Sequence, residues 1–254
     1  MKLHYKQYGE GKTPLFILHG IFGMLDNWHN IARQLSENYT VYTLDARNHG
    51  QSPHCDVMGY ESMAADVIEL ANDLGIEQFV LMGHSMGGKT ALWTAHKYPE
   101  RVSKLIAVDI APKTYKPGHL QYFKALREID WSTLNTRKEI DEALMAYEPN
   151  AGVRLFLAKN IERNENGGFS VKCNVDALES AYPEIIGELD FKHEYKGPTL
   201  FILGENSHYL LETDKPNIEA YFTDVHYENV ANAGHWVHAD NPTGFMSALL
   251  PFLQ

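Results

Sequence analysis

Short apolar segments alternate with amphipathic helical patterns along the first part of this chain, and this alternation restricts the fold more than any other feature. The apolar segments have the length of buried strands and lie at 15–18, 40–44, 78–82 and 102–108. The helical patterns between them begin at about 26, 60 and 85 and end near 36, 74 and 98. Such alternation is typical of a mostly parallel sheet with helices on both faces. We therefore predict a twisted α/β sheet flanked by helices.

The pattern changes near Lys113. From there to Asp190 the sequence shows charged amphipathic helical stretches, such as 120–129 and 137–147, in place of strand patterns. Strand patterns return at 198–203 and 225–230, and 243–253 predicts a closing helix. We predict one core built from 1–112 and 191–254, with a helical cap inserted at 113–190. Because ligands bind to such sheets at the carboxyl ends of the strands, catalytic side chains should directly follow strands.

The segment Gly83-His84-Ser85-Met86-Gly87 joins a predicted strand to a predicted helix. This is the G-x-S-x-G pattern of a nucleophile elbow, in the strand–turn–helix context that the pattern requires. The turn strains the backbone of the serine, and a glycine two residues away on each side leaves room for it. The turn also raises the hydroxyl next to the positive end of the helix. Ser85 is therefore the predicted nucleophile, and a simple glycine-rich turn is the alternative.

A serine nucleophile needs a general base, and imidazole has a suitable pKa. Of the 13 histidines, His235 follows the last predicted strand and precedes the last helix, which makes it the predicted base. We expect the nearby His238 to be a surface residue. A tetrahedral intermediate also needs two amide donors. We predict that this oxyanion hole is formed by the amide of Met86 and by that of Ile21, in the segment His19-Gly20-Ile21-Phe22-Gly23.

Together these motifs resemble those of the α/β-hydrolase superfamily, and the resemblance covers nearly the whole chain. The segment Asp45-Ala46-Arg47-Asn48-His49-Gly50-Gln51-Ser52 is similar to the family's D-x-R-x-x-G-x-S loop, where Asp45 and Arg47 would order a turn. Within the superfamily, GHSMGGK, HGIFG, VDIAP and GHWVHADNP are most similar to segments of the YbfF-type bacterial esterases. The resemblance implies a serine hydrolase of carboxylic esters or thioesters that forms an acyl-enzyme on Ser85.

The acid that orients the base is harder to assign. Many α/β-hydrolases carry it after the strand that follows the cap. Here that loop reads Gly204-Glu205-Asn206-Ser207-His208, with Ser207 where the aspartate would fall. Asp109 ends the strand next to the elbow strand, and a variation within the superfamily uses an acid there. We predict Asp109, with Glu205 and Asp214 as alternatives, and Ser207 as an auxiliary hydrogen-bonding residue.

Charge and composition exclude several other functions. The 22 basic and 33 acidic residues give a net charge of −11, which repels nucleic acid and anionic lipid. No apolar run approaches the ~18 residues of a membrane span. Because the first residues lack the apolar core of a signal peptide, we expect a cytoplasmic protein, and a monomer by default. Cys55 and Cys173 are too few for a disulfide scaffold. No metal or organic cofactor is expected, because the chain supplies every catalytic role.

One basic segment stands out in this acidic chain. Between 113 and 127 the charged residues are all Lys or Arg. Lys124 and Arg127 are three residues apart and would share a helix face. Two interpretations remain open: the pair binds an anionic part of the substrate, such as the phosphates of an acyl-CoA thioester, or it forms a solvated helix face.

The residue type at the elbow also separates rival functions. Ser85 argues against haloalkane dehalogenases and epoxide hydrolases, which use an aspartate nucleophile. Cofactor-free haloperoxidases, C–C hydrolases and lyases of the superfamily keep the serine triad, so these functions stay open. A non-hydrolytic small-molecule receptor on the same fold is the alternative from a different class. Rapid multiple turnover of an ester would distinguish an esterase from such a receptor.

Overall fold

The computed structural model of the protein describes residues 1–165 and 167–254. At its centre is a seven-stranded sheet in the order β1-β3-β2-β4-β5-β8-β9. The strands are β1 (Tyr5–Tyr8), β2 (Thr13–Leu18), β3 (Tyr39–Leu44), β4 (Phe79–His84), β5 (Val102–Val108), β8 (Tyr195–Gly204) and β9 (Phe222–Val230). β1 pairs antiparallel with β3, and the other pairs are parallel. The predicted mostly parallel α/β sheet is therefore confirmed, and β1 is an edge strand that was not predicted.

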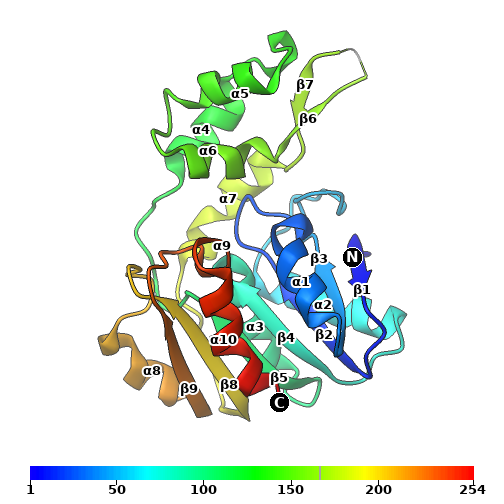
Figure 1. Ribbon diagram of the computed structural model, residues 1–254, viewed down its shortest axis with the longest axis vertical. Helices are drawn as coiled ribbons and strands as arrows, with labels where there is room; N and C mark the ends of the chain where they lie inside the picture. Colours follow the sequence, from blue (N-terminus) through cyan, green and yellow to red (C-terminus); the bar gives the residue numbers. More distant parts are fainter. Residues whose placement is uncertain (166) are drawn as a thin grey trace.

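Helices cover both faces of this sheet. They are α1 (His29–Leu35), α2 (Tyr60–Asp73), α3 (Met86–Lys97) and α10 (Pro242–Leu253). Leu15 and Ile17 of β2 share a buried cluster with residues of α1 and α10, the helices at the front of Figure 1. Phe16 and Leu18 share a cluster with residues of α2 and α3. Because successive side chains of a strand point to opposite faces, a strand covered on both faces is apolar at consecutive positions. This explains why the apolar runs were visible in the sequence.

Between β5 and β8 the chain leaves the sheet and forms a group of elements above the end of β5 (Figure 1). These elements are α4 (Leu120–Glu128), η2 (Trp131–Thr133), α5 (Arg137–Leu144), α6 (Ala151–Ala158), β6 (Ile161–Arg163), β7 (Phe169–Val171) and α7 (Val175–Ile186). Helices α4 and α5 lie where helices were predicted. The antiparallel hairpin of β6 and β7 was not predicted, because strands of three residues are too short to show an alternating pattern.

Two short connections join this inserted segment to the core, and they are hydrogen-bonded to each other. The amide of Tyr115 donates to the Ile186 carbonyl at 2.8 Å, and the amide of Leu189 donates to the Pro112 carbonyl at 2.9 Å. We call residues 111–115 and 186–189 the paired connections. Because they are bonded together, the chain leaves the core and rejoins it side by side.

The remaining short elements are η1 (Leu25–Trp28), η3 (Glu212–Asp214), α8 (Lys215–Glu219) and α9 (Val237–Asp240). His238, in α9, was expected at the surface, and this prediction is wrong. Its ring is buried and stacks on that of Trp28, with the ring centroids 3.9 Å apart. None of the helices in residues 1–165 and 167–254 is long and apolar enough to cross a lipid bilayer.

Candidate active site

Ser85 lies at the turn between β4 and α3. Its φ of 53° and ψ of −117° are a backbone conformation that residues other than glycine rarely adopt. A Cβ on Gly83 would lie 2.1 Å from the carbonyl oxygen of Gly87, and one on Gly88 would lie 2.5 Å from the side chain of Ile110. Glycine is therefore required at both positions for the strand and the helix to approach so closely. The turn has the backbone geometry expected of the motif.

Asp109 and His235 meet beside this turn. Asp109 follows β5 with a φ of 48°, and its side chain is buried. His235 lies in the loop after β9, and its Nδ1 donates to Asp109 Oδ2 at 2.7 Å. Two more donors reach the same carboxylate: the Ser207 hydroxyl bonds Oδ2 at 2.5 Å, and the Gly204 amide bonds Oδ1 at 3.1 Å. The residue after β5 thus supplies the carboxylate, and two of its donors come from the last residue of β8 and from the loop after it.

The two alternative acids have other partners. Glu205 accepts a hydrogen bond from the amide of Asn232 at 2.8 Å. Asp214 forms an ion pair with Lys113 and accepts a hydrogen bond from the amide of Leu211. The structure therefore brings Asp109, and neither alternative, into contact with the imidazole of His235.

Burial shifts the pKa values of both members of the His235–Asp109 pair. It lowers the pKa of His235 to about 3, and the neighbouring His119 contributes in the same direction. It raises the pKa of Asp109 to about 6, although the hydrogen bonds from Ser207 and Gly204 act against this rise. At pH 7 the imidazole is therefore neutral and the carboxylate is ionised. Since the carboxylate accepts the proton on Nδ1, Nε2 is left unprotonated and can accept a proton.

Contacts on its ring and its backbone hold His235 in this orientation. The ring of Tyr209 stacks on the imidazole with centroids 3.6 Å apart and an interplanar angle of 13°. The buried His84, within the elbow, donates from Nε2 to the carbonyl oxygen of His235 at 2.8 Å. The imidazole is thus oriented by a carboxylate at one edge and an aromatic ring on one face.

The loop after β2 contributes a backbone amide to the same region. The amide of Phe22 donates to His49 Nε2 at 3.2 Å, and the amide of Gly23 donates within the loop at 2.9 Å. In the part of the chain that the structure describes, the amides of Ile21 and Met86 have no hydrogen-bond acceptor. Both residues line the cavity described next, so two unoccupied donors are available there.

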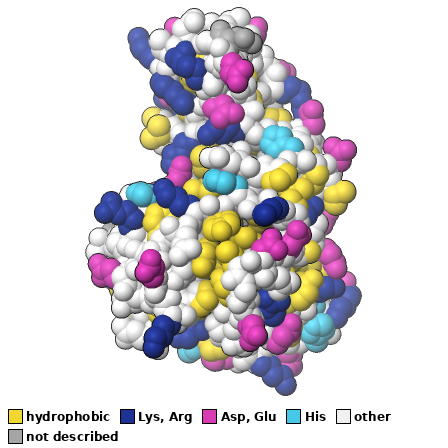
Figure 2. Space-filling model, turned by 90° about the vertical axis from the view of Figure 1, so that its right-hand side faces the viewer, with side chains coloured by type: hydrophobic (Ala, Val, Ile, Leu, Met, Phe, Trp, Pro, Cys, Tyr) yellow, Lys and Arg dark blue, Asp and Glu magenta, His cyan; other side chains and the backbone are white. Residues whose placement is uncertain are grey.

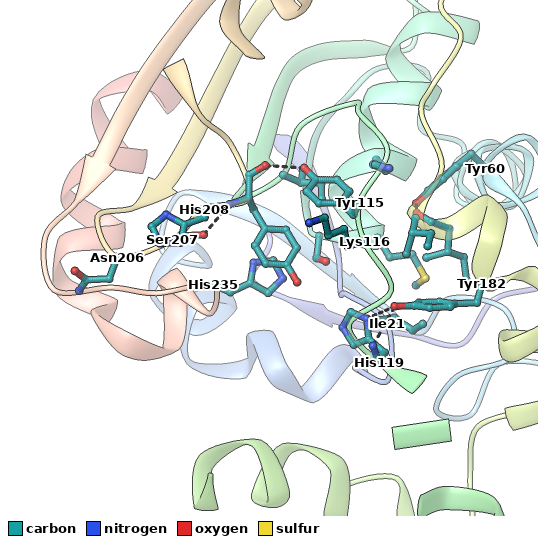
Figure 3. Close-up of a pocket in the computed structure, with 17 residues that line it drawn as sticks. Ile21, Tyr60, Tyr115, Lys116, His119, Tyr182, Asn206, Ser207, His208 and His235 are labelled. Carbon is teal, nitrogen blue, oxygen red and sulfur yellow. Dashed lines mark hydrogen bonds between the residues drawn. The ribbon is translucent and has the colours of Figure 1, made fainter. Parts of the chain in front are cut away.

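A cavity of about 440 Å³ connects these groups. Ser85 and His235 both line it, although no hydrogen bond joins their side chains among the described residues. Such a bond is often long in the absence of substrate. Figure 3 shows His235 and Ser207 on one side and Tyr60 and Tyr182 on the other. In Figure 2, hydrophobic and histidine side chains gather where the inserted segment meets the core.

Comparison with known proteins gives this architecture a family. A family model described as the alpha/beta hydrolase fold matches residues 13–242. The chain belongs to this family. Among curated relatives, the sn-1-specific diacylglycerol lipase ABHD11 of Xenopus laevis is 39% identical, over 95% of this chain and 80% of its own length. Esterase YbfF of Escherichia coli is 33% identical over the full length of both. A solved marine microorganism esterase is 41% identical, with a TM-score of 0.96 over 99% of both chains.

These relatives confirm the predicted α/β-hydrolase resemblance and its YbfF-type branch. They also confirm the predicted enzyme class, a carboxylesterase-type hydrolase. The fold alone is shared more widely. One solved E-2-(acetamidomethylene)succinate hydrolase, at 23% identity, matches with a TM-score of 0.79.

Two further predicted residues of this α/β-hydrolase lie on α4, and neither lines the cavity. Lys124 Nζ is 3.9 Å from Glu128, whereas Arg127 pairs with Asp176 at 2.7 Å and with Glu179 at 2.5 Å. Their ion pairs are those of a solvated helix face. The anion-binding role of Lys124 and Arg127 stays a prediction.

Lys89, which lies in the cavity wall, was not predicted as a site residue. Its only signal was a single cation on the apolar face of the helix after the elbow, in the run MGGKTALW. No group of three or more His, Cys, Asp or Glu side chains in residues 1–165 and 167–254 could hold a metal ion.

Proposed function

We propose that this α/β-hydrolase is a serine esterase that forms an acyl-enzyme on Ser85, with His235 as general base and Asp109 as the orienting acid. The observation that carries the proposal is the 2.7 Å hydrogen bond between His235 Nδ1 and the buried carboxylate of Asp109. It leaves Nε2 as the proton acceptor at a cavity that Ser85 also lines. This is the arrangement of groups that nucleophilic catalysis by serine needs.

The reaction runs in two halves. In the first, Ser85 Oγ attacks the ester carbonyl carbon while His235 Nε2 takes the hydroxyl proton. The carbonyl oxygen becomes an oxyanion, which accepts hydrogen bonds from the amides of Ile21 and Met86. The tetrahedral intermediate then collapses, and His235 gives its proton to the departing alcohol. In the second half, water attacks the acyl-enzyme carbonyl carbon while His235 Nε2 accepts a proton from this water. The second tetrahedral intermediate then collapses, His235 returns the proton to Ser85 Oγ, and the carboxylic acid leaves.

Asp109 acts when His235 becomes positively charged. A buried imidazolium would be costly without a counterion, and the carboxylate at 2.7 Å supplies one. Ser207 and Gly204 hold this carboxylate by one hydrogen bond to each oxygen. We therefore assign Ser207 an auxiliary role, in which it orients Asp109 rather than contacting the substrate.

The cavity walls indicate the class of ester. A volume of about 440 Å³ suits a small molecule, and Ile110, Ile185 and Ile186 give the walls an apolar character that fits an acyl chain. Relatives named as diacylglycerol lipases are consistent with an ester that carries an acyl chain. We propose residues 113–190 as the cap that closes this cavity. Thioesters present the same acyl group and form the second substrate class to be tested.

Substitution of the nucleophile tests the proposal. In Ser85→Ala we expect the kcat for p-nitrophenyl butyrate to fall by at least about 10⁴-fold, and the mass increase caused by a fluorophosphonate to disappear. Ser247→Ala is the matched control, since Ser247 is exposed on α10 and its hydroxyl donates to the Thr243 carbonyl. It should keep both activity and labelling. Continued labelling of Ser85→Ala would refute the nucleophile assignment, and a wild type that turns over only once would favour a receptor.

A further inference from the structure

Lys89 is a buried cation one helical turn after Ser85. It lies on α3, its amide donates to the Ser85 carbonyl at 3.0 Å, and its side chain is 1% exposed. A buried ammonium group is costly unless its N–H groups find acceptors. The groups that accept hydrogen bonds from Nζ should therefore explain why a lysine occupies this buried position.

The two acceptors of Lys89 belong to the paired connections of the inserted segment. Nζ donates to the carbonyl of Lys113 at 2.8 Å and to the carbonyl of Gly187 at 2.5 Å. The rings of Tyr115 and Tyr60 flank the same ammonium, with centroids 4.9 Å and 5.9 Å from Nζ. One side chain thus reaches from the helix of the nucleophile to both points where the chain leaves and rejoins the core.

The paired connections continue directly into the walls of the cavity. Tyr115 lies in the first connection and Ile186 in the second, and both line the cavity above Ser85. If the two connections moved away from α3, these walls would move with them. A link between Lys89 and the connections therefore determines how far the walls stand from the nucleophile.

We infer that Lys89 is a positioning residue that ties both connections of the inserted segment to the nucleophile helix and thereby sets the part of the cavity that receives the acyl chain. This inference rests on the proposed function of Ser85. Burial lowers the pKa of Lys89 to about 7, with Glu188 acting in the opposite direction. Either protonation state keeps at least two N–H groups, so both hydrogen bonds can form on either side of neutral pH.

The test compares two lysines that make the same kind of contact. Lys104 Nζ also donates to two backbone carbonyls, those of Phe252 at 2.7 Å and Leu253 at 3.1 Å, but it lies on β5 and not in the cavity wall. The variants Lys89→Met and Lys104→Met therefore each lose two hydrogen bonds to backbone carbonyls, at different places. For each we would measure kcat and KM on p-nitrophenyl acetate and hexanoate, and stability by urea unfolding.

The hexanoate chain reaches walls that the acetyl group does not, so selectivity is the informative quantity. We expect Lys89→Met to change the hexanoate-to-acetate ratio of kcat/KM by about tenfold, mainly through the KM for hexanoate. We expect Lys104→Met to keep the ratio within about twofold even where it loses stability. An unchanged ratio in folded Lys89→Met, or an equal change in both variants, would overturn the inference.

Two further measurements keep the test decisive. If Lys89→Met does not fold, Thr114→Val loosens the paired connections more gently, because exposed Thr114 accepts the Glu188 amide at 3.1 Å. The same shift in selectivity, of smaller size, is then expected, and an unchanged ratio would count against the inference.

Calorimetric binding of hexanoate to Ser85→Ala, with and without Lys89→Met, reports on the cavity without turnover. Weaker binding in the double variant supports the role of Lys89 even if the acyl-enzyme proposal fails, and equal binding refutes it.

Discussion

Replacing Asp109 by asparagine should separate catalysis from stability. The carboxylate accepts hydrogen bonds from His235, Ser207 and Gly204. In Asp109→Asn, the amide oxygen can still accept from Gly204, but the NH2 group faces the other two residues. It can donate to the Ser207 hydroxyl and to His235 Nδ1, so the side chain stays satisfied. The imidazole proton then moves to Nε2, which is the wrong tautomer for a general base.

Asp109→Asn should affect activity and stability in opposite directions. We expect kcat to fall by about 10⁴-fold, which corresponds to about 5 kcal/mol of transition-state stabilisation. The free energy of unfolding, by contrast, should stay the same or rise in this variant. Because burial raises the pKa of Asp109 from 3.8 to about 6, the folded state binds this proton more tightly than the unfolded state does. The ionised carboxylate therefore costs the folded protein up to about 3 kcal/mol at pH 7.

Because the proton on Asp109 is bound more tightly in the folded state, the difference in stability between wild type and Asp109→Asn depends on pH. The folded wild type loses stability as pH rises from about 4 through about 6, and the asparagine variant does not share this loss. Urea unfolding followed by circular dichroism should show Asp109→Asn as stable as the wild type or more so at pH 7, with the difference vanishing at pH 3. Steady-state kinetics on p-nitrophenyl butyrate gives kcat. A folded variant with kcat within about tenfold of the wild type would refute the reasoning. Glu205→Gln, which alters an acid outside the site, should leave both quantities unchanged.

The remaining predictions concern the groups around this pair. Ser207 lowers the pKa of Asp109, so Ser207→Ala should raise it and move the acid limb of the kcat/KM profile, expected near pH 6 in the wild type, to higher pH. A pH titration between 5 and 8 measures this, and an unmoved limb would show that Ser207 does not act through the carboxylate. The anion-binding hypothesis predicts that Lys124→Ala with Arg127→Ala raises the KM for an acyl-CoA but not for a neutral p-nitrophenyl ester. Equal KM values for wild type and variant on both substrates would leave these cations in surface ion pairs only.

Local geometry explains what could be predicted from the sequence. The elbow at Ser85 needs glycines at fixed offsets, because a Cβ on Gly83 would collide with the backbone of Gly87. The motif is therefore recognisable from the five consecutive residues 83–87. The central strands were equally visible, since burial on both faces makes them continuously apolar. The base was expected late in the chain, between the last predicted strand and the last helix, and His235 lies there.

Contacts between distant segments explain what could not be predicted. Asp109 was predicted from its place at a strand end, but Glu205 and Asp214 stayed open as alternatives, because the choice depends on which strand end faces the loop of His235. The burial of His238 depends on Trp28, which is far away in the sequence. Lys89 was overlooked for the same reason, because its acceptors at Lys113 and Gly187 become neighbours only when the inserted segment folds.

The separation of the carboxylate from its donors has a consequence for the site. Asp109 directly follows β5, whereas Gly204 ends β8 and Ser207 lies in the loop after it. The end of β8 and the loop after it therefore both act on the carboxylate, through an amide and a hydroxyl. If the loop after β8 shifted, the carboxylate would stay beside His235 but lose the hydrogen bond from Ser207, and the pKa of Asp109 would rise. Under the proposed mechanism, we therefore expect the pH dependence of kcat/KM to report the position of this loop.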